Sequence, residues 1–146
     1  MRFAQIRDCV ETDATTDGGI DASALTGIWV NSNPDSHGIA RMVISECNGN
    51  VTLQVFAIGP GGLIDWGTAD VTVFASAPSA KVSAGMTCCY DFGFVEVRLQ
   101  GMLLKGLMVL AELHNFKDDS KRVDYFVREY FVSDHGRYQI KDSPIR

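Results

Sequence analysis

Apolar and polar residues alternate over most of the chain, and this period of two predicts half-buried β-strands. Two such runs, "HGIARMVISEC" and "VTLQVFAI", flank Asn48-Gly49, a strong signal for a two-residue hairpin turn. Pairing about that turn predicts an apolar inner face and a mixed outer face, because directly opposed residues of antiparallel strands share a face. The inner pairs are Ile44 with Leu53, Met42 with Val55 and Ala40 with Ala57; the outer pairs are Ser45 with Thr52, Val43 with Gln54 and Arg41 with Phe56.

Further strands are expected along the rest of the chain, and no long helix is. They are "GIWVN", "TADVTVFAS", "MTCCYDFGFVEVRLQG" with a bend at Gly93, "LMVLAELHNF" and "RVDYFVREYFV". About eight consecutive strands with mostly short connections predict an antiparallel up-and-down barrel or a sandwich. Residues 1–23 show no sustained period, so we expect them to form a flexible N-terminal arm before a single domain of residues 24–146.

The last two runs are expected to form a hairpin across "KDDSK". A loop of even length gives the pairs Leu113 with Phe126, Ala111 with Arg128 and Val109 with Tyr130. We predict that this face points inward, because its members on the first strand are all apolar. The opposite face, predicted to lie in water, carries Glu112, His114, Tyr125 and Glu129. A loop of odd length would reverse the two faces.

Charge and composition narrow the class of protein. The net charge is −5, which argues against non-specific nucleic-acid binding and against an anionic membrane surface. No apolar run reaches the ~18 residues of a membrane-spanning helix, and the first residues lack the apolar stretch of a secretory signal. We therefore expect a soluble, cytoplasmic protein that binds neither nucleic acid nor membrane.

The words "LTGIWVNS" resemble the first strand of the calycins, the superfamily of lipocalins, fatty-acid-binding proteins and avidins, whose entry motif is Gly-x-Trp. The resemblance implies an up-and-down barrel with Trp29 as the plug of one end and Arg128, from a late strand, packed over it. The chain also resembles an uncharacterised class of bacterial calycin-like domains, through Trp29, Asn31, "DWG" at 65–67 and "YDFGF" at 90–94. It departs from the avidins in having two tryptophans, and it lacks the helices of lipocalins and fatty-acid-binding proteins.

The run "FGFVEVRLQ" allows two orientations. In the first, Leu99 and the two valines point inward and the charged residues form a solvated pair, the usual place for charges. In the second, Phe94, Glu96 and Arg98 stand in an aromatic cavity, where the charged pair could bind a polar head group or act as acid and base.

Other chemistry is sparse. No nucleophile motif, P-loop, dinucleotide fingerprint or zinc-ligand spacing is present, so we expect no cofactor and no metal and assign no catalytic residue. Cys88 and Cys89 are neighbours in a strand and should point to opposite faces as free thiols. Glu112 and His114 could form an acid–base pair, although exposed polar residues suit the predicted outer face better. Trp66 either caps the barrel or packs its loop down, and packing is the commoner role.

These observations leave three functions open. The leading one is a non-enzymatic barrel that holds a small, largely apolar ligand with a polar or anionic group. Its predicted ligand-binding residues are Trp29, Phe94, Glu96, Arg98, Phe126, Arg128 and Tyr130. The second is a small biosynthetic enzyme of the cyclase or isomerase type, with Glu96 and the arginines as working groups. The third is an interaction module with a filled barrel and an exposed apolar patch, for which a homodimer through a sheet face is one arrangement.

Overall fold

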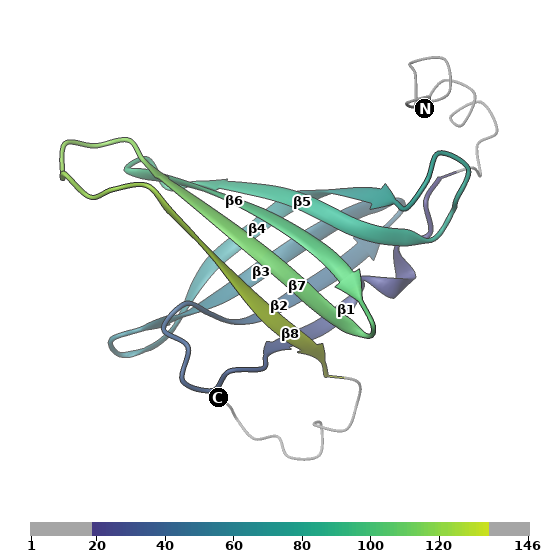
Figure 1. The fold of residues 1–146 in the computed structure, drawn as a ribbon, viewed down its shortest axis with the longest axis horizontal. Coiled ribbons are helices and arrows are strands. Elements are labelled where there is room, and N and C mark those ends of the chain that lie inside the picture. Colours follow the sequence, from purple (N-terminus) through teal and green to yellow (C-terminus); the bar gives the residue numbers. More distant parts are fainter. Residues whose placement is uncertain (1–18, 135–146) are drawn as a thin grey trace.

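Eight antiparallel strands pair in chain order and close into a barrel in the computed structural model, which describes residues 19–134 (Figure 1). The strands are β1 (Gly27–Asn31), β2 (Ile39–Cys47), β3 (Asn50–Gly59), β4 (Gly62–Ala75), β5 (Ser83–Asp91), β6 (Val95–Leu104), β7 (Leu107–Phe116) and β8 (Tyr125–Ser133). A 3₁₀ helix of three residues, η1 (Ala22–Ala24), precedes β1. The predicted all-β, up-and-down barrel is confirmed. Within the described part of the chain, no helix is long and apolar enough to cross a membrane.

The β2–β3 hairpin follows the register predicted from its turn. Asn48 and Gly49 have φ angles of 54° and 86°, as a type I′ turn requires. The predicted pairs form, and their inner members are almost fully buried. One pair is wrong: the register shifts between Ile39 and Arg41, so Ile39 rather than Ala40 pairs with Ala57. This irregularity keeps the Ile39 side chain in the core, with 0% of it exposed.

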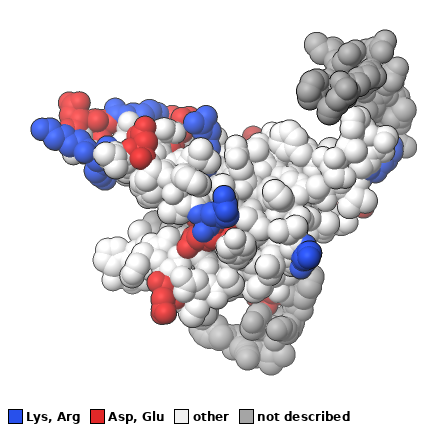
Figure 2. All heavy atoms as spheres, in the orientation of Figure 1, with Lys and Arg blue, Asp and Glu red and all other residues white. Residues whose placement is uncertain are grey.

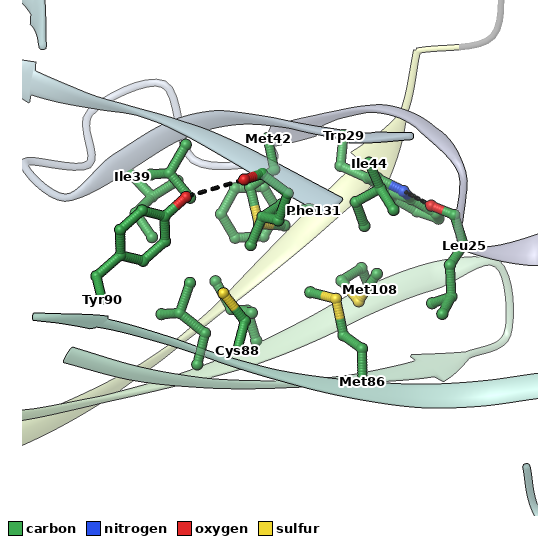
Figure 3. Packing of buried hydrophobic residues seen from close by; sticks show 14 of the residues in the cluster. Leu25, Trp29, Ile39, Met42, Ile44, Met86, Cys88, Tyr90, Met108 and Phe131 are labelled. Atoms are coloured by element: carbon green, nitrogen blue, oxygen red, sulfur yellow. Dashed lines mark hydrogen bonds between the residues drawn. The ribbon is translucent and has the colours of Figure 1, made fainter. Parts of the chain in front are cut away.

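The interior of the barrel is filled by its own side chains. Figure 3 shows residues of β1 and β2 packed against residues of β5, β7 and β8. The side chains with no exposed surface include Leu25, Ile39, Met42, Leu53, Val55, Leu99, Met108, Leu110 and Phe131. Gly101 lies among them, and a Cβ there would meet Met108 Sδ at 2.8 Å and Met86 Cε at 3.0 Å. Interdigitation this tight explains the choice of glycine in mid-strand.

One end of the barrel, which we call the η1 end, is closed. The Trp29 side chain is 4% exposed, and its Nε1–H donates to the Leu25 carbonyl at 2.8 Å. The Asp21 N–H donates to the Lys81 carbonyl at 2.7 Å, and the Asp21 carbonyl accepts from Ser83 N–H at 3.1 Å. These two hydrogen bonds attach the backbone at Asp21 to the segment that leads into β5. Residues 1–18 of the predicted N-terminal arm lie outside the described residues.

The other end, which we call the mouth, is formed by loops 32–38, 60–61, 92–94 and 117–124. Residues on the inner face of β8 are partly exposed there, with Tyr125 at 47% and Val127 at 38%. By contrast, Phe131 on the same face of β8, deeper in the barrel, is fully buried. In Figure 1 the hairpin of β7 and β8 extends past the rest of the barrel at this end.

The β7–β8 hairpin has the predicted register but the opposite orientation. Its pairs are Leu113 with Phe126, Ala111 with Arg128 and Val109 with Tyr130, as expected. This set faces outward, because the alternate set contains Phe131, Met108 and Leu110, which are fully buried. The prediction that Phe126, Arg128 and Tyr130 lie inside is therefore wrong, and so is the predicted packing of Arg128 over Trp29.

The reason for this reversal is that both faces of β7 are apolar along most of their length. Val109, Ala111 and Leu113 made one face look like core, but Met108 and Leu110 on the other face are larger and fully buried. The larger side chains fill the barrel, and Glu112 is carried inside with them because it shares their face.

Candidate functional site

Two carboxyl groups lie on the inner face of the barrel near the mouth. Glu112, on β7, is 2% exposed, and Glu129, on β8, is half-buried. Glu112 Oε2 and Glu129 Oε1 are buried without another polar partner among the described residues. Burial, together with the hydrogen bond and the charge of Glu129, raises the pKa of Glu112 to about 8. With a pKa of about 8, the Glu112 carboxyl is mostly protonated at neutral pH.

An imidazole and a phenol connect this pair with the surface. His114 Nε2 lies 3.5 Å from Glu112 Oε1, and the His114 ring stacks on Tyr125 with centroids 4.3 Å apart. Burial lowers the pKa of His114. Near pH 7 the contact therefore joins a neutral imidazole to a neutral carboxyl and is a hydrogen bond rather than an ion pair. Burial and then the charge of Glu112 raise the pKa of Tyr125.

Loop 32–38 covers the carboxyl pair from the side of β1. Ser36 Oγ donates to Glu129 Oε2 at 2.5 Å and accepts from Gly38 N–H at 3.0 Å. A Cβ on Gly38 would meet Glu129 Oε1 at 3.2 Å, so the loop backbone approaches the carboxyl closely. Asn31, where β1 ends, holds the base of the loop, because its Nδ2–H donates to the Ile39 carbonyl at 2.8 Å.

Exposed apolar side chains surround the mouth. They are Ile64 (48% exposed), Phe92 (37%), Phe94 (45%), Tyr125 (47%) and Val127 (38%), which we call the rim. Phe92 lies edge-on to Trp66, with centroids 5.2 Å apart, and Trp66 packs against the core. Trp66 therefore has a packing role, as preferred, but it lies within β4 and not in the loop in which it was expected. An apolar rim around a buried polar group is a common composition for a small-molecule site.

Two hollows stand out among the described residues, and neither is enclosed within the barrel. The larger, of about 690 Å³, lies over the outer face of β4–β8 and is lined by Phe74, Met102, Leu104, Val109, Arg128 and Tyr130 among others. We call it the outer groove. The smaller, of about 260 Å³, lies against the β7–β8 hairpin near the mouth, and its lining includes Arg98, His114, Tyr125 and Phe126.

The predicted ligand-binding residues are thus dispersed. Trp29 is in the core of the η1 end, Phe94 is on the rim, and Arg98 and Phe126 line the smaller hollow. Arg128 and Tyr130 line the outer groove. Glu96 is half-buried on the outer face, and its Oε2 accepts from Cys89 Sγ at 3.5 Å. Of the two orientations for this strand, the structure has the one with Val95, Val97 and Leu99 inward, at 5%, 1% and 0% exposure.

Glu112 and His114 are therefore in contact, as an acid–base pair requires, but they lie on the inner face of the barrel and not on the predicted outer face. Glu129 and Ser36 were missed as site residues. The signal for Glu129 was present in the predicted register, which places it opposite Leu110 and two residues from Val127, on the face of Glu112. Nothing in the local sequence around Ser36 indicates a contact with β8, since the two residues are separated by 93 positions.

Cys47, Cys88 and Cys89, which lie among the described residues, are free thiols. Cys88 points inward and Cys89 outward, as two adjacent strand residues must. Burial raises the pKa of Cys88 to about 11, which keeps it protonated and unreactive. Among residues 19–134 no three His, Cys, Asp or Glu side chains are placed to hold a metal ion. No protein-family model matches the chain, and no curated protein is significantly similar to it.

Proposed function

We propose that this protein binds a small, largely apolar molecule at the mouth of its barrel, with a polar group of that molecule bonded to the Glu112–Glu129 pair. The main support for this proposal is that Glu112 and Glu129 each have a buried carboxyl oxygen with no hydrogen-bond donor among the described residues. Such a pair costs folding free energy, so a barrel that served only as a scaffold would gain by replacing it with apolar side chains. The Gly27-x-Trp29 opening and the eight-stranded barrel support placing the chain among calycin-like proteins, many of which hold such ligands.

The chemistry of the mouth favours a ligand whose polar group donates hydrogen bonds. The arginines that we expected to bind an anionic group face outward, at Arg98 and Arg128. The groups within reach of the mouth are carboxyl, imidazole and phenol. A hydroxyl, amide or amine suits the two carboxyls better than an anion does, because it can donate a hydrogen bond to an oxygen that otherwise has none. The rim supplies aromatic and aliphatic surface for the apolar part.

Native mass spectrometry of the freshly purified protein, beside its denatured mass, tests the proposal. We expect an adduct that survives in the native spectrum and disappears on denaturation. Tyr125→Ala, at the rim, should lower the occupancy of the adduct, whereas Phe74→Ala, in the outer groove, should leave it unchanged. An adduct lost with Phe74→Ala and retained with Tyr125→Ala would place the ligand outside the barrel and contradict the proposal.

Glu112→Gln then separates binding from catalysis. A carboxyl that is protonated at neutral pH and lies beside a neutral imidazole is suited to act as a general acid. If the molecule is only held, the purified variant carries the same compound at lower occupancy. If it is converted, the variant accumulates a different compound, which favours the enzymatic alternative with Glu112 in the role first assigned to Glu96.

The outer groove favours a second function, the docking of another protein. The barrel is filled, and large apolar side chains are exposed along the groove, including Phe74 at 49% and Met102 at 53%. Figure 2 shows this face with few charged side chains beyond those gathered at loop 117–124. A filled interior and an exposed apolar patch are the two features expected of a domain that binds another protein. Phe74→Asp should abolish such docking and leave adduct binding at the mouth intact.

A further inference from the structure

The barrel is closed over only part of the length of β8. β1 pairs with β8 at three positions, from Trp29 with Ser133 to Asn31 with Phe131, and Ser32 N–H donates to the Tyr130 carbonyl. Before Tyr130, the stretch Tyr125–Glu129 pairs with β7 on one edge. Along its other edge no strand formed by residues 19–134 pairs with it. Figure 1 shows this half of β8 running toward loop 117–124 with no strand beside its second edge.

The backbone groups on this free edge can be assigned from the alternation of the strand. Because the Tyr130 carbonyl is bonded to Ser32, on the side away from β7, the N–H and C=O groups of Arg128 and Phe126 point to that side as well. Both residues are exposed, with Phe126 at 59%. An exposed row of unpaired donors and acceptors is a template for another strand, and up-and-down barrels normally leave none.

We propose that a second copy of the chain pairs its β8 antiparallel to this edge, with Val127 on the two-fold axis. The free stretch has five residues, and a register centred on Val127 pairs all of them. The N–H and C=O groups of Phe126 then bond to those of the partner's Arg128, and the reverse pair bonds by symmetry. The free backbone edge of β8 supports this pairing without reference to the ligand proposed above, although both involve Glu129.

The side chains in this register complement each other. Phe126 lies opposite the partner's Arg128 on the outer face, where a guanidinium can cover an aromatic ring. Tyr125 lies opposite the partner's Glu129 on the inner face, where a phenol can donate to a carboxylate. A register centred on Arg128 would instead oppose two arginines and run into Ser32, which already bonds to Tyr130. The favoured register also places the partner's Tyr125 beside the carboxyl pair of the mouth.

Sedimentation equilibrium as a function of concentration, with proline as the probe of the free edge, tests the pairing. Arg128→Pro removes an N–H that faces the edge without removing a bond to β7. Two cross-strand bonds are lost per dimer, so we expect dissociation to become easier by roughly tenfold or more. Arg128→Ala keeps the N–H and should weaken the dimer less. A protein that is monomeric at every concentration, or a dimer that Arg128→Pro leaves unchanged, overturns the proposal.

Disulfide mapping checks the register in case the proline variant fails to fold. In a background of Cys9→Ser, Cys47→Ser and Cys89→Ser, oxidised Val127→Cys should cross-link to its own copy, because residues on the axis form a non-hydrogen-bonded pair about 4.5 Å apart. Phe126→Cys and Arg128→Cys should each remain uncoupled alone and should couple when mixed. Peptide mapping identifies the bond. Self-coupling of Phe126→Cys without coupling of Val127→Cys contradicts the register.

Discussion

The two ends of the barrel are built on different principles. At the η1 end, Leu25 and Trp29 are buried, and the one polar atom of the indole has a backbone partner. At the mouth, Glu112 is equally buried, but its carboxyl depends on a second carboxyl and on a neutral imidazole. The first arrangement stabilises the fold. The second costs stability, because a buried carboxyl lacks part of its hydrogen bonding. Such a loss of stability is expected at a functional site, because unsatisfied groups are the ones available to a ligand.

The largest change in the free energy of unfolding at a single pH is expected from a substitution at the closed end. Trp29→Ala should lower the free energy of unfolding by about 3–5 kcal/mol, because it removes a large buried ring and leaves a cavity. Tyr125→Ala at the mouth should cost about 1 kcal/mol, since its ring is half exposed and gives up mainly its stacking on His114. Urea unfolding of both variants measures the difference. Equal costs would show that the mouth is packed as firmly as the closed end.

A second large change in the free energy of unfolding is expected at the mouth, and it depends on pH. The pKa of Glu112 is 4.5 in the unfolded chain and about 8 in the folded one. The folded protein therefore binds the extra proton between these values, and the stability from this group is lost as pH rises through that window. Relative to Glu112→Gln, the wild-type protein should lose about 5 kcal/mol of unfolding free energy from acid pH to pH above 8, since each unit of pKa shift corresponds to about 1.4 kcal/mol.

Urea unfolding of both proteins across this window measures that difference. The comparison with Glu112→Gln is needed because His114 acts in the opposite sense. Its pKa is lowered in the folded state, so its contribution is lost as pH falls below its ordinary value. That contribution is present in both proteins and cancels in the difference. Parallel curves for the two proteins would show that Glu112 is not held protonated by the fold.

The smallest effect concerns the loop over the carboxyl pair. Ser36→Ala removes the hydroxyl that donates to Glu129 and should cost about 1 kcal/mol. Amide hydrogen exchange in loop 32–38 should become faster, while exchange at the η1 end stays unchanged. Ser32→Ala is the matched control, because the Ser32 side chain is exposed and only its backbone bonds to β8. Faster exchange in the control as well would mean that Ser36 does not fasten the loop.

The local alternation of apolar and polar residues was sufficient to predict how neighbouring strands pair in two hairpins. The Asn48-Gly49 turn fixes its own hairpin, because both residues must take positive φ angles and the strands then have one alignment. The register of the β7–β8 hairpin was predicted just as well. The bulge between Ile39 and Arg41 was not, since Ile39 and Ala40 are both apolar and the local pattern does not show which of them pairs with Ala57.

What the sequence by itself determined is therefore the approximate number of strands, their order and the registers of the β2–β3 and β7–β8 hairpins, since these follow from neighbours in the chain. Which face of β7 and β8 points inward was decided only by closure of the barrel. Each face carries apolar residues, and the choice depends on whether Met108, Leu110 and Phe131 or the smaller alternate set fills the interior against β2 and β5. That long-range packing places Glu112 and Glu129 inside, and with them the candidate site.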